Sequence, residues 1–377
     1  MSGRDRSFAL RLLRETTVWR ARVDRALARY CSRPLETLDP LILAALRAGA
    51  TQLLILGTPA HAAVSETVNA VARHRGRGMV NAVLRRLAEE GEPDLSAAGT
   101  AIRYSHPEDL VERWMTRFGE ADTLRLMDWN NTVPTLGGYP LGGGPGVSPG
   151  LYLTGYGRLR RTGSSPMDQG HEGLYIQDES AALVGRACSG LANGGSVLEI
   201  GAAPGGKTHH LQTGSRFVAA LDSDPERLSR LSRNSRRLGW RNVLPVAGDG
   251  TSPPFRGSFG MVLLDAPCTN TGVYRRRPDA RWNWSSGHLN AMVSLQRALL
   301  GSAAELVAPG GVLVYSTCSL EEEENRGQVR AFSSRRSDFR PEGLEAPAEL
   351  VTDGMISIFP PEHGIDGLFA AAWRREI

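Results

Sequence analysis

The sequence predicts an α/β protein, in which an all-α bundle at the N-terminus precedes an open, doubly wound parallel sheet. Up to residue 90, apolar residues recur three and four positions apart, as they do on one face of a helix. From residue 174 onward, strand-like and helix-like segments alternate, and this alternation is typical of parallel strands with right-handed crossovers. With 377 residues, of which 41% are hydrophobic, the chain is long enough for two or three domains.

The predicted helical domain covers residues 1–91. Asp39 followed by Pro40 is a good N-cap with proline at the first helical position, and it opens a helix over residues 41–56. Two more helices are predicted over residues 61–74 and 78–87. The helical spacing before them depends on six apolar residues: Phe8, Leu12, Leu13, Val23, Leu27 and Tyr30.

The helical domain is also basic. Residues 1–90 contain 15 Arg and 8 Asp plus Glu, a formal charge of 15 − 8 = +7, whereas the whole chain has a net charge of +4. This excess of positive charge is compatible with an anionic partner such as nucleic acid, although a solvated helical face explains it equally well.

Residues 92–175 are predicted to bridge the two main domains. Ser105-His106-Pro107-Glu108 has the pattern of a capping box, and Gly119 is a suitable C-terminal stop for the helix that follows. Between Gly137 and Gly173 the chain contains 12 glycines and little apolar periodicity. This stretch is expected either to order only locally, as a reduced subdomain, or to act as a flexible linker.

The third predicted domain covers residues 176–377. Its alternating segments are residues 196–200, 206–212, 217–221, 225–238, 242–246, 259–264, 289–307 and 311–315. Two short strands, residues 355–359 and 368–373, are expected to close the chain as a hairpin-like edge. Binding sites in such sheets lie in the loops beyond the carboxyl ends of the strands.

A glycine-rich turn between the first strand and helix of this domain is the candidate cofactor site. It contains Gly201, Ala202, Ala203, Pro204, Gly205, Gly206 and Lys207. Glycines let the backbone approach a ligand closely, and the N–H groups of the helix that follows face it. Residues 201–208 also satisfy the Walker A pattern Gly-x-x-x-x-Gly-Lys-Thr, which would predict a phosphate-binding loop.

Three aspartates favour another cofactor. Asp222, Asp249 and Asp265 each follow one of three successive strands. Each alone could be a turn or cap residue, but together they suit a cofactor with ribose hydroxyls, an exocyclic amine and an ammonium group rather than a triphosphate. S-adenosylmethionine has these three donors. Lys207 is the only lysine in the chain, which suggests a site that needs an ammonium rather than a guanidinium.

Two of the four cysteines stand directly after predicted strands. Cys268 ends Asp265-Ala266-Pro267-Cys268, and Cys318 lies in Ser316-Thr317-Cys318-Ser319. Neighbouring strands place these residues at adjacent loop positions, and a thiolate is the strongest nucleophile among ordinary side chains. The cysteines are too few and too scattered for a disulfide scaffold and lack a zinc spacing, so no metal is expected.

These motifs resemble those of the Nop2/Sun group of RNA cytosine-5 methyltransferases. The resemblance runs from about residue 177 to the C-terminus. It includes residues 201–208, 265–268, 271–273, 276–279 and 315–319, then Glu323-Glu324-Asn325. Residues 59–87 resemble the NusB-like domain found in one bacterial branch that acts on 16S rRNA. The resemblance implies a NusB-like helical domain and a Rossmann-like class I methyltransferase domain.

The resemblance also implies residue roles. Cys318 would attack C6 of cytosine, so that C5 can accept a methyl group from S-adenosylmethionine, and Cys268 would assist release. Asp265 and Lys207 would lie against the cytosine ring. The residues themselves suggest an RNA-binding surface beside the catalytic loop. Arg275, Arg276, Arg277 and Arg281 are interleaved with Tyr274, Trp282 and Trp284, and together they offer phosphate contacts and stacking surfaces, although a solvated basic loop is the alternative.

The sequence thus predicts an S-adenosylmethionine-dependent RNA cytosine-5 methyltransferase that acts on 16S rRNA. There are two main alternatives: the substrate is a tRNA or another RNA, or the protein is a non-catalytic RNA-binding protein of ribosome assembly. A Walker-type ATPase is a third alternative, less favoured than these two. The N-terminus has no apolar signal core and no apolar run reaches the ~18 residues of a membrane span, so we expect a cytoplasmic monomer without a membrane or metal partner. Residues 321–324 are expected to begin a helix, favoured by its dipole.

Overall fold

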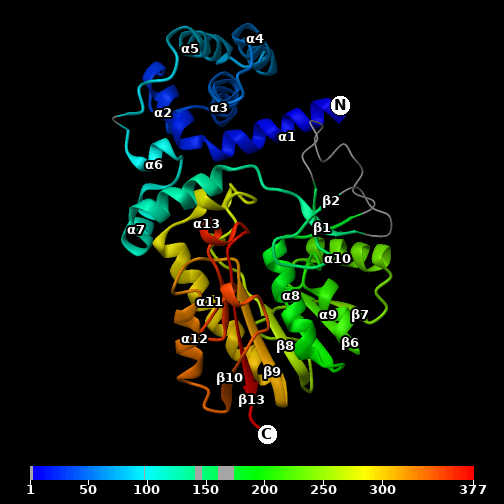
Figure 1. Ribbon diagram of the computed structural model, residues 1–377. Helices are drawn as coiled ribbons and strands as arrows, with labels where there is room; N and C mark the ends of the chain where they lie inside the picture. The colour runs from blue at the N-terminus through cyan, green and yellow to red at the C-terminus, as the bar shows by residue number, and fades with distance from the viewer. Residues whose placement is uncertain (1–2, 97, 141–146, 160–173) are drawn as a thin grey trace. The chain divides into compact units, whose positions relative to one another are not determined.

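The structure, a computed structural model, describes residues 3–96, 98–140, 147–159 and 174–377 (Figure 1). The chain forms two compact units. The N-terminal unit comprises Met1–Val133 together with Arg275–Asn283, and the C-terminal unit comprises Pro134–Tyr274 and Trp284–Ile377. The predicted fold class is confirmed, whereas the domain boundaries at residues 91 and 175 remain predictions. None of the described helices is both long and apolar enough to cross a membrane.

The N-terminal unit is helical. Its helices are α1 (Gly3–Val18), α2 (Arg20–Tyr30), α3 (Pro40–Leu54), α4 (Ala60–Ala70), α5 (Arg77–Glu90), α6 (Thr100–Arg103) and α7 (Glu108–Asn131). Asp39 caps α3 as predicted, since its carboxylate accepts hydrogen bonds from the N–H groups of Leu41 and Ile42. Val23, Leu27 and Tyr30 are buried in the bundle core as their spacing predicts. By contrast, Phe8 and Leu13 are exposed, because α1 buries residues only near its C-terminal end.

One prediction about α7 is wrong and the other is confirmed. Ser105 is not its cap: Pro107 precedes the first turn, and the Ser105 hydroxyl instead accepts a hydrogen bond from the N–H of Ala21. Gly119 does stop the first helical segment, because its φ of 77° is not helical. A second helical segment follows this kink directly and continues to Asn131, so that α7 consists of two segments. A glycine takes this conformation readily because it has no Cβ.

The segment Arg275–Asn283 is attached to the N-terminal unit through buried polar contacts. The Arg281 guanidinium donates hydrogen bonds to the backbone carbonyls of Ser105 and Asn130 and to the side chain of Asn131. Arg281 is 0% exposed. Next to it, the indole of Trp282 donates to the carbonyl of Thr17. This part of the predicted RNA-binding loop is therefore packed into the bundle.

The C-terminal unit is built on a nine-stranded sheet. Its strands are β5 (Ser196–Ile200), β6 (Phe217–Asp222), β7 (Val243–Ala247), β8 (Phe259–Asp265), β9 (Val307–Thr317), β10 (Phe339–Glu342), β11 (Val351–Thr352), β12 (Met355–Ile358) and β13 (Leu368–Arg375). Strands β9, β8, β5, β6 and β7 are adjacent in this order and parallel, as the alternating pattern predicts. The chain starts at β5, extends to β6 and β7 on one side, and then returns to β8 and β9 on the other.

Helices cover both faces of the sheet. They are α8 (Glu179–Ala192), α9 (Thr208–Gly214), α10 (Pro225–Leu238), α11 (Ser286–Glu305), α12 (Arg326–Ser333) and α13 (Pro360–His363). Figure 1 shows α8, α9 and α10 on one side of the sheet and α11 and α12 on the other. Alternate residues of the same strand enter different cores: Val197 packs with α8, and Leu198 packs with α11. This period of two follows from the strand geometry.

The C-terminal strand corrects one prediction. Strands β12 and β13 do pair antiparallel, as expected of a hairpin. However, β13 is not an edge, because it lies between β12 and β9 and is antiparallel to both. Residues Leu368 to Trp373 are all buried, and a strand covered on both faces is expected to be apolar throughout.

The glycine-rich stretch orders locally, one of the two expected outcomes. Its described residues form β1 (Gly137–Pro140), β2 (Val147–Pro149) and β3 (Gly157–Leu159), which with β4 (Leu174–Ile176) make a four-stranded antiparallel sheet. At Gly138 a Cβ would lie 1.9 Å from the carbonyl oxygen of Tyr175, so no larger residue fits between β1 and β4. Residues 141–146 and 160–173 of this stretch lie outside the described residues.

We expect Arg281→Ala to destabilise the N-terminal unit. The substitution leaves the buried carbonyls of Ser105 and Asn130 without their donor, at a cost of about 3 kcal/mol in the free energy of unfolding. Urea denaturation, monitored by circular dichroism, measures this cost. The control is Arg277→Ala, which removes an exposed guanidinium and should change stability by less than about 0.5 kcal/mol. Equal effects of the two substitutions would show that Arg281 does not support the unit.

Candidate functional site at the carboxyl edge of the sheet

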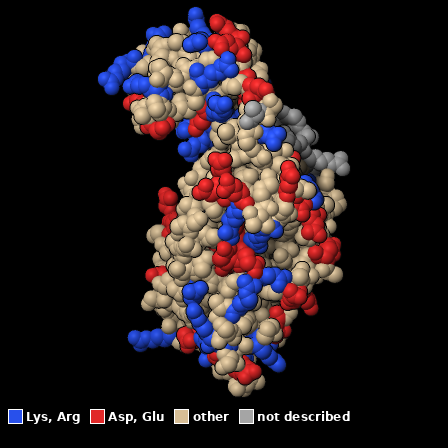
Figure 2. Space-filling view, turned by 90° about the vertical axis from the view of Figure 1, so that its left-hand side faces the viewer, with Lys and Arg blue, Asp and Glu red and all other residues tan. Residues whose placement is uncertain are grey.

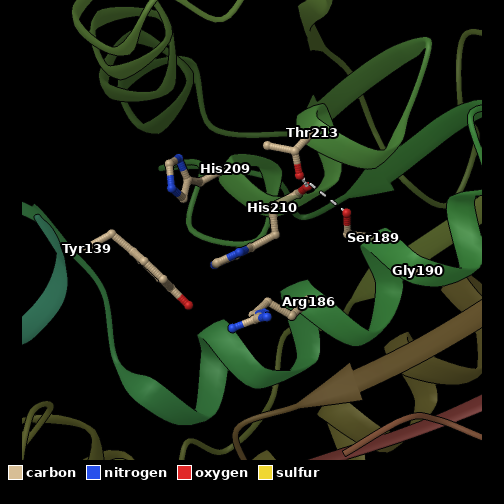
Figure 3. A pocket seen from close by; sticks show the side chains of 7 residues that line it. All are labelled: Tyr139, Arg186, Ser189, Gly190, His209, His210 and Thr213. Atoms are coloured by element: carbon tan, nitrogen blue, oxygen red, sulfur yellow. Dashed lines mark hydrogen bonds between the residues drawn. The ribbon is translucent and has the colours of Figure 1, made fainter. Parts of the chain in front are cut away.

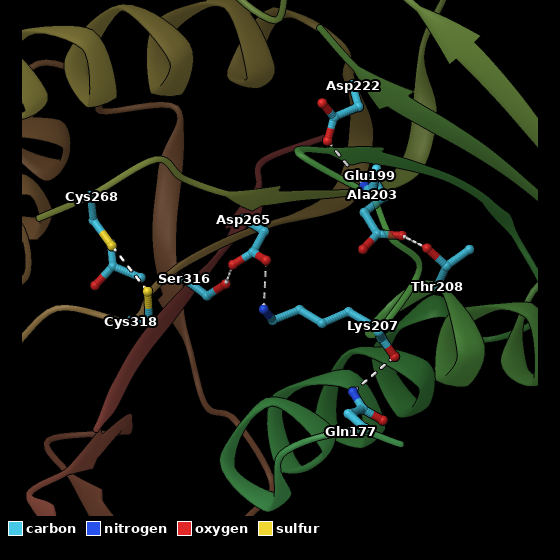
Figure 4. A network of polar contacts seen from close by, with 12 residues as sticks. Gln177, Glu199, Ala203, Lys207, Thr208, Asp222, Asp265, Cys268, Ser316 and Cys318 are labelled. Carbon is cyan, nitrogen blue, oxygen red and sulfur yellow. Dashed lines mark hydrogen bonds and ion pairs between the residues drawn. The ribbon is translucent and has the colours of Figure 1, made fainter. Parts of the chain in front are cut away.

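The predicted site residues converge at one edge of the sheet. Parallel strands end at the same edge, so the loops after β5, β6, β7, β8 and β9 lie together there. The reversal of strand order falls between β5 and β8, which is where open α/β sheets bind their ligands. Figure 4 shows Lys207, Asp222, Asp265 and both cysteines within this region.

The turn after β5 is held by its own backbone hydrogen bonds. The N–H groups of Gly201 and Ala202 donate to the carbonyl of Leu221, and that of Gly205 donates to the carbonyl of Ala202. The N–H of Ala203 donates to the Asp222 carboxylate. At Gly201, where φ is 80°, a Cβ would lie 2.3 Å from the carbonyl oxygen of Asp265. Glycine is therefore required for β5 and β8 to approach each other at this point.

This geometry argues against the Walker A interpretation. A phosphate-binding loop needs free N–H groups that point to the phosphates, and the N–H groups of Gly201, Ala202, Ala203 and Gly205 are already bonded within the protein. Thr208, which would bind magnesium in such a loop, donates its hydroxyl hydrogen to the buried carboxylate of Glu199. The similarity to the pattern is one of sequence only.

Lys207 forms the central ion pair of the site. Its Nζ lies 2.7 Å from Oδ2 of Asp265, and the Ser316 hydroxyl donates to Oδ1 of the same carboxylate over 2.9 Å. Burial is the largest influence on the Lys207 pKa and lowers it, but the charge and hydrogen bond of Asp265, with smaller contributions from other groups, raise this pKa above its ordinary value. Lys207 is therefore a buried cation at neutral pH. It is 7% exposed, whereas the side chain of Asp265 is 32% exposed.

The two cysteines at the strand ends lie in contact. Their Sγ atoms are 3.2 Å apart, and all four cysteines of the chain are free thiols. The hydrogen bond between Cys268 and Cys318, followed by burial, raises the pKa of the Cys268 thiol well above its ordinary value. Cys268 thus stays protonated at neutral pH and can donate its S–H to the sulfur of Cys318. The structure brings together the pair that the sequence predicts.

Asn270 joins the loops that carry these cysteines. Its Nδ2 donates to the carbonyl of Cys268 over 2.8 Å, and its Oδ1 lies 3.3 Å from Sγ of Cys318. The backbone of Asn270 has a φ of 61°, a conformation that asparagine tolerates better than most residues. Sequence reasoning did not identify this residue.

Glu324 belongs to one of the motifs that carry the family resemblance, but its role in the site was not predicted from the sequence. It is 0% exposed, and its carboxylate accepts hydrogen bonds from the N–H and hydroxyl of Thr269, the hydroxyl of Ser319 and the side-chain amide of Gln296. Thr269 follows Cys268 and Ser319 follows Cys318, so one carboxylate holds both cysteine loops. The prediction that residues 321–324 begin a helix is wrong, because α12 starts only at Arg326.

The predicted cofactor acids differ in their surroundings. Asp222 is 3% exposed, and its two oxygens each accept one backbone hydrogen bond, from Ala203 and from Asp224. Oδ2 also lies 3.6 Å from Nη1 of Arg227, whereas Oδ1 keeps a second lone pair for a ribose hydroxyl. Asp249 is exposed after β7, and Asp265 follows β8. Three carboxylates on one edge fit the hydroxyl, amine and ammonium donors of S-adenosylmethionine.

The described residues contain no cluster of His, Cys, Asp and Glu that could hold a metal ion.

The four arginines predicted to bind RNA do not share one environment. Arg281 is buried and bonded to carbonyls, and Arg275 lies with its guanidinium carbon 3.9 Å from the ring centroid of Trp129. Both are therefore engaged within the N-terminal unit, so the expectation that Arg281 contacts phosphate is not supported. Arg276 is half-buried and Arg277 is exposed, and these two remain RNA-binding predictions.

A separate cavity of about 400 Å³ lies between α8 and α9 in the C-terminal unit (Figure 3). It is lined by Tyr139, Arg186, Ser189, Gly190, His209, His210 and Thr213. Burial, together with the neighbouring His209, lowers the pKa of His210 to about 3, so this ring is neutral. The cavity contains none of the predicted site residues, although His210 is connected through Gln177 to the carbonyl of Gly206 in the cofactor turn.

Glu199, which was not identified from the sequence, is expected to make the stability of the protein depend on pH. It is 1% exposed on β5, and burial raises its pKa to about 8. Between its ordinary pKa of 4.5 and about 8, the folded state keeps a proton that the unfolded state loses, so stability falls as pH rises, by about 1.4 kcal/mol per pH unit. Glu199→Gln should remove this slope in urea denaturation at pH 5.5, 6.5 and 7.5. Exposed Glu226→Gln should keep it, and parallel slopes for both variants would contradict the assignment.

Comparison with known proteins agrees with this site. The family model described as 16S rRNA methyltransferase RsmB/F matches residues 190–374, and the NusB family model matches residues 1–89. Ribosomal RNA small subunit methyltransferase B of Thermus thermophilus is 36% identical over 99% of this chain and 89% of its own length. The protein of the same name from Xanthomonas campestris pv. campestris is 33% identical over 92% of this chain and 84% of its own length.

A solved structure has the same fold over almost the whole chain. The crystal structure of PH0851 covers 97% of this chain and 89% of its own, with a TM-score of 0.86 and 25% identity. The N-terminal match to the NusB family accounts for the helical unit, and the match over residues 190–374 contains both cysteine loops. The chain therefore belongs to the 16S rRNA methyltransferase RsmB/F family, and it is an rRNA methyltransferase that uses S-adenosylmethionine.

Proposed function

We propose that this rRNA methyltransferase modifies cytosine at C5, through a covalent bond between Cys318 and C6 of the base, and that its substrate is 16S rRNA. The observation that carries the proposal is the contact between two thiols, 3.2 Å apart, at the ends of adjacent parallel strands. Methylation of an oxygen or an amine needs no nucleophile on the enzyme. C5 of cytosine does, because the ring carbon is too electron-poor to attack a methyl donor.

The reaction begins with addition of the Cys318 thiolate to C6. The S–C6 bond forms, and the electron pair of the C5–C6 double bond makes C5 nucleophilic. The ion pair of Lys207 and Asp265 assists at the polar edge of the base, where it stabilises the charge that develops at N3 and the exocyclic amine. Bound S-adenosylmethionine supplies the methyl group.

Release reverses the addition. Once C5 carries the methyl group, a water molecule takes the C5 proton, the electron pair of the C5–H bond restores the C5–C6 double bond, and the S–C6 bond breaks, so that Cys318 leaves as a thiolate. Cys268 remains protonated at neutral pH and lies within hydrogen-bonding distance of that sulfur. Its S–H donor stabilises the leaving thiolate, which explains why such a site holds two thiols rather than one.

Substitution of the cysteines tests the mechanism. Cys318→Ala should lower the rate of methyl transfer about a thousandfold or more, because no covalent adduct forms. Cys268→Ala should accumulate an enzyme–RNA adduct that survives denaturing electrophoresis, because addition proceeds and release fails. Cys31→Ala removes a thiol of the N-terminal unit and should leave the rate unchanged. Mild and equal losses in Cys318→Ala and Cys268→Ala would rule out the covalent mechanism.

The identity of the RNA needs its own measurement. Bisulfite sequencing of total RNA from cells with and without the gene should show one or a few 16S rRNA cytosines whose protection depends on the gene. Complementation with the Cys318→Ala variant should not restore that protection, whereas Cys31→Ala should. Gene-dependent protection confined to tRNA would replace 16S rRNA as the substrate and leave the chemistry intact.

A further inference from the structure

Helix α10 and the two residues after Gly239 carry an unusual concentration of arginine. Six arginines fall within the 15 residues 227–241. The whole chain has 43 arginines in 377 residues, since 44 of its residues are lysine or arginine and Lys207 is the only lysine. At the average frequency, 15 residues would contain about two. The single acid of residues 225–241 is Glu226, in the first turn of the helix. Compositional bias alone does not account for this density.

The arginines lie on the side of α10 that faces away from the core. Leu228, Leu231 and Ser235 are the buried residues of the helix. Arg230, Arg233 and Arg237 are exposed, and their spacing of three and four places them along one face. Arg241, also exposed, follows the helix after Gly239, which ends it with a φ of 68°. We call Arg230, Arg233, Arg237 and Arg241 the arginine row.

The arginine row is not neutralised by the protein. None of its four guanidinium groups makes a hydrogen bond or ion pair with another described residue, whereas the guanidinium of Arg227 pairs with Asp222 and that of Arg236 bonds to the carbonyl of Ser232. Several other arginines of the C-terminal unit are matched by acids. Arg326 pairs with Asp353, Arg330 with Glu322 and Arg336 with Glu305. Figure 2 shows acidic and basic side chains interleaved in this way on another face.

The helix starts at the edge of the sheet that carries the site. It begins directly after β6 and its cap Asp224, and Arg227 in its first turn donates to the carbonyl of Ala203 in the cofactor turn. Strand β6 lies two strands from β8, which leads to Cys268. At about 4.8 Å between neighbouring strands, this lateral distance is about 10 Å. Because α10 connects two parallel strands, it runs from this edge back towards the start of β7, so Arg230 is the member of the row nearest the site and Arg241 the farthest. A few nucleotides next to a base held at the cysteines can reach Arg230, and the strand can then follow the row.

We propose that the arginine row binds the phosphate backbone of the RNA that flanks the target cytosine. Four unpaired guanidiniums on one face are complementary to consecutive phosphates, and their contacts would carry no sequence information. The row would thus add affinity and hold the strand while other contacts select the base. The inference rests on the RNA substrate of the proposed function, but not on cytosine or on the covalent mechanism.

The test compares two variants with the same change in charge. The row variant carries Arg230→Gln, Arg233→Gln, Arg237→Gln and Arg241→Gln. The control carries Arg256→Gln, Arg297→Gln, Arg335→Gln and Arg340→Gln, four exposed arginines of the same unit that also lack a bonded partner among the described residues. Binding of unmodified, transcribed 16S rRNA is measured by filter retention from 50 to 200 mM KCl. Glutamine is a good helix former, so α10 should persist.

The row variant should bind the RNA about tenfold or more weakly at 150 mM KCl. Its plot of log K against log salt concentration should be shallower by about 3, since each lost phosphate contact removes about 0.7 from the slope for single strands. Methyl transfer at saturating RNA should keep its rate, with a higher KM. Equal weakening in the row variant and the control would overturn the proposal, because net charge alone would then explain it.

The same experiment separates this inference from the proposed function. If the parent protein binds and methylates the RNA but the row variant does so with unchanged affinity and salt dependence, the arginine row is not a docking surface and the proposed function stands. If the parent transfers methyl groups to a position other than cytosine C5, the proposed function fails. The binding comparison still decides the role of the row in that case.

Discussion

The position of both thiols depends on one buried carboxylate, that of Glu324. The hydrogen bonds that hold β8 to β9 end at Asp265 and Ser316, two or three residues before the cysteines. Beyond that point, other contacts join the loops. The N–H of Gly272 donates to the carbonyl of Cys318, and the buried Glu324 carboxylate accepts hydrogen bonds from Thr269 in one loop and Ser319 in the other.

A buried carboxylate is stable only while its hydrogen-bond donors stay in place. Its burial raises its pKa, and the hydrogen bonds from Ser319 and Thr269 oppose that effect. If either loop shifted, the carboxylate would lose donors in a place that water does not reach, at a cost of about 1 to 3 kcal/mol for each unsatisfied group. The network therefore favours a single arrangement of the loops, in which the sulfur atoms lie in contact. Gln296 extends the network to α11 and so connects the loops to the core on that face of the sheet.

The sequence predicted those parts of the molecule that depend on local pattern. Alternating apolar segments predicted the parallel strands, and because such strands end together, the motifs of Lys207, Asp265, Cys268 and Cys318 could be assigned to one site. Three failures had physical causes that lie far along the chain. Ser105 bonds to Ala21 instead of capping α7, Arg281 is buried against residues about 150 positions away, and Glu324 bonds to Thr269, 55 residues earlier. Hydrogen bonds over such separations leave no periodic signal, and the acidic run that contains Glu324 looks like a surface feature.

The uniqueness of Lys207 has a practical consequence. Because every other basic side chain is arginine or histidine, the only primary amines of the chain are this ε-amino group and the N-terminal α-amino group. An acylating reagent selective for unprotonated amines must wait until the Lys207–Asp265 pair opens and the ammonium loses its proton, both of which the buried ion pair opposes. The extent of acylation at this one side chain is therefore a direct chemical reporter of how often the site opens. No lysine has to be removed to make the measurement specific.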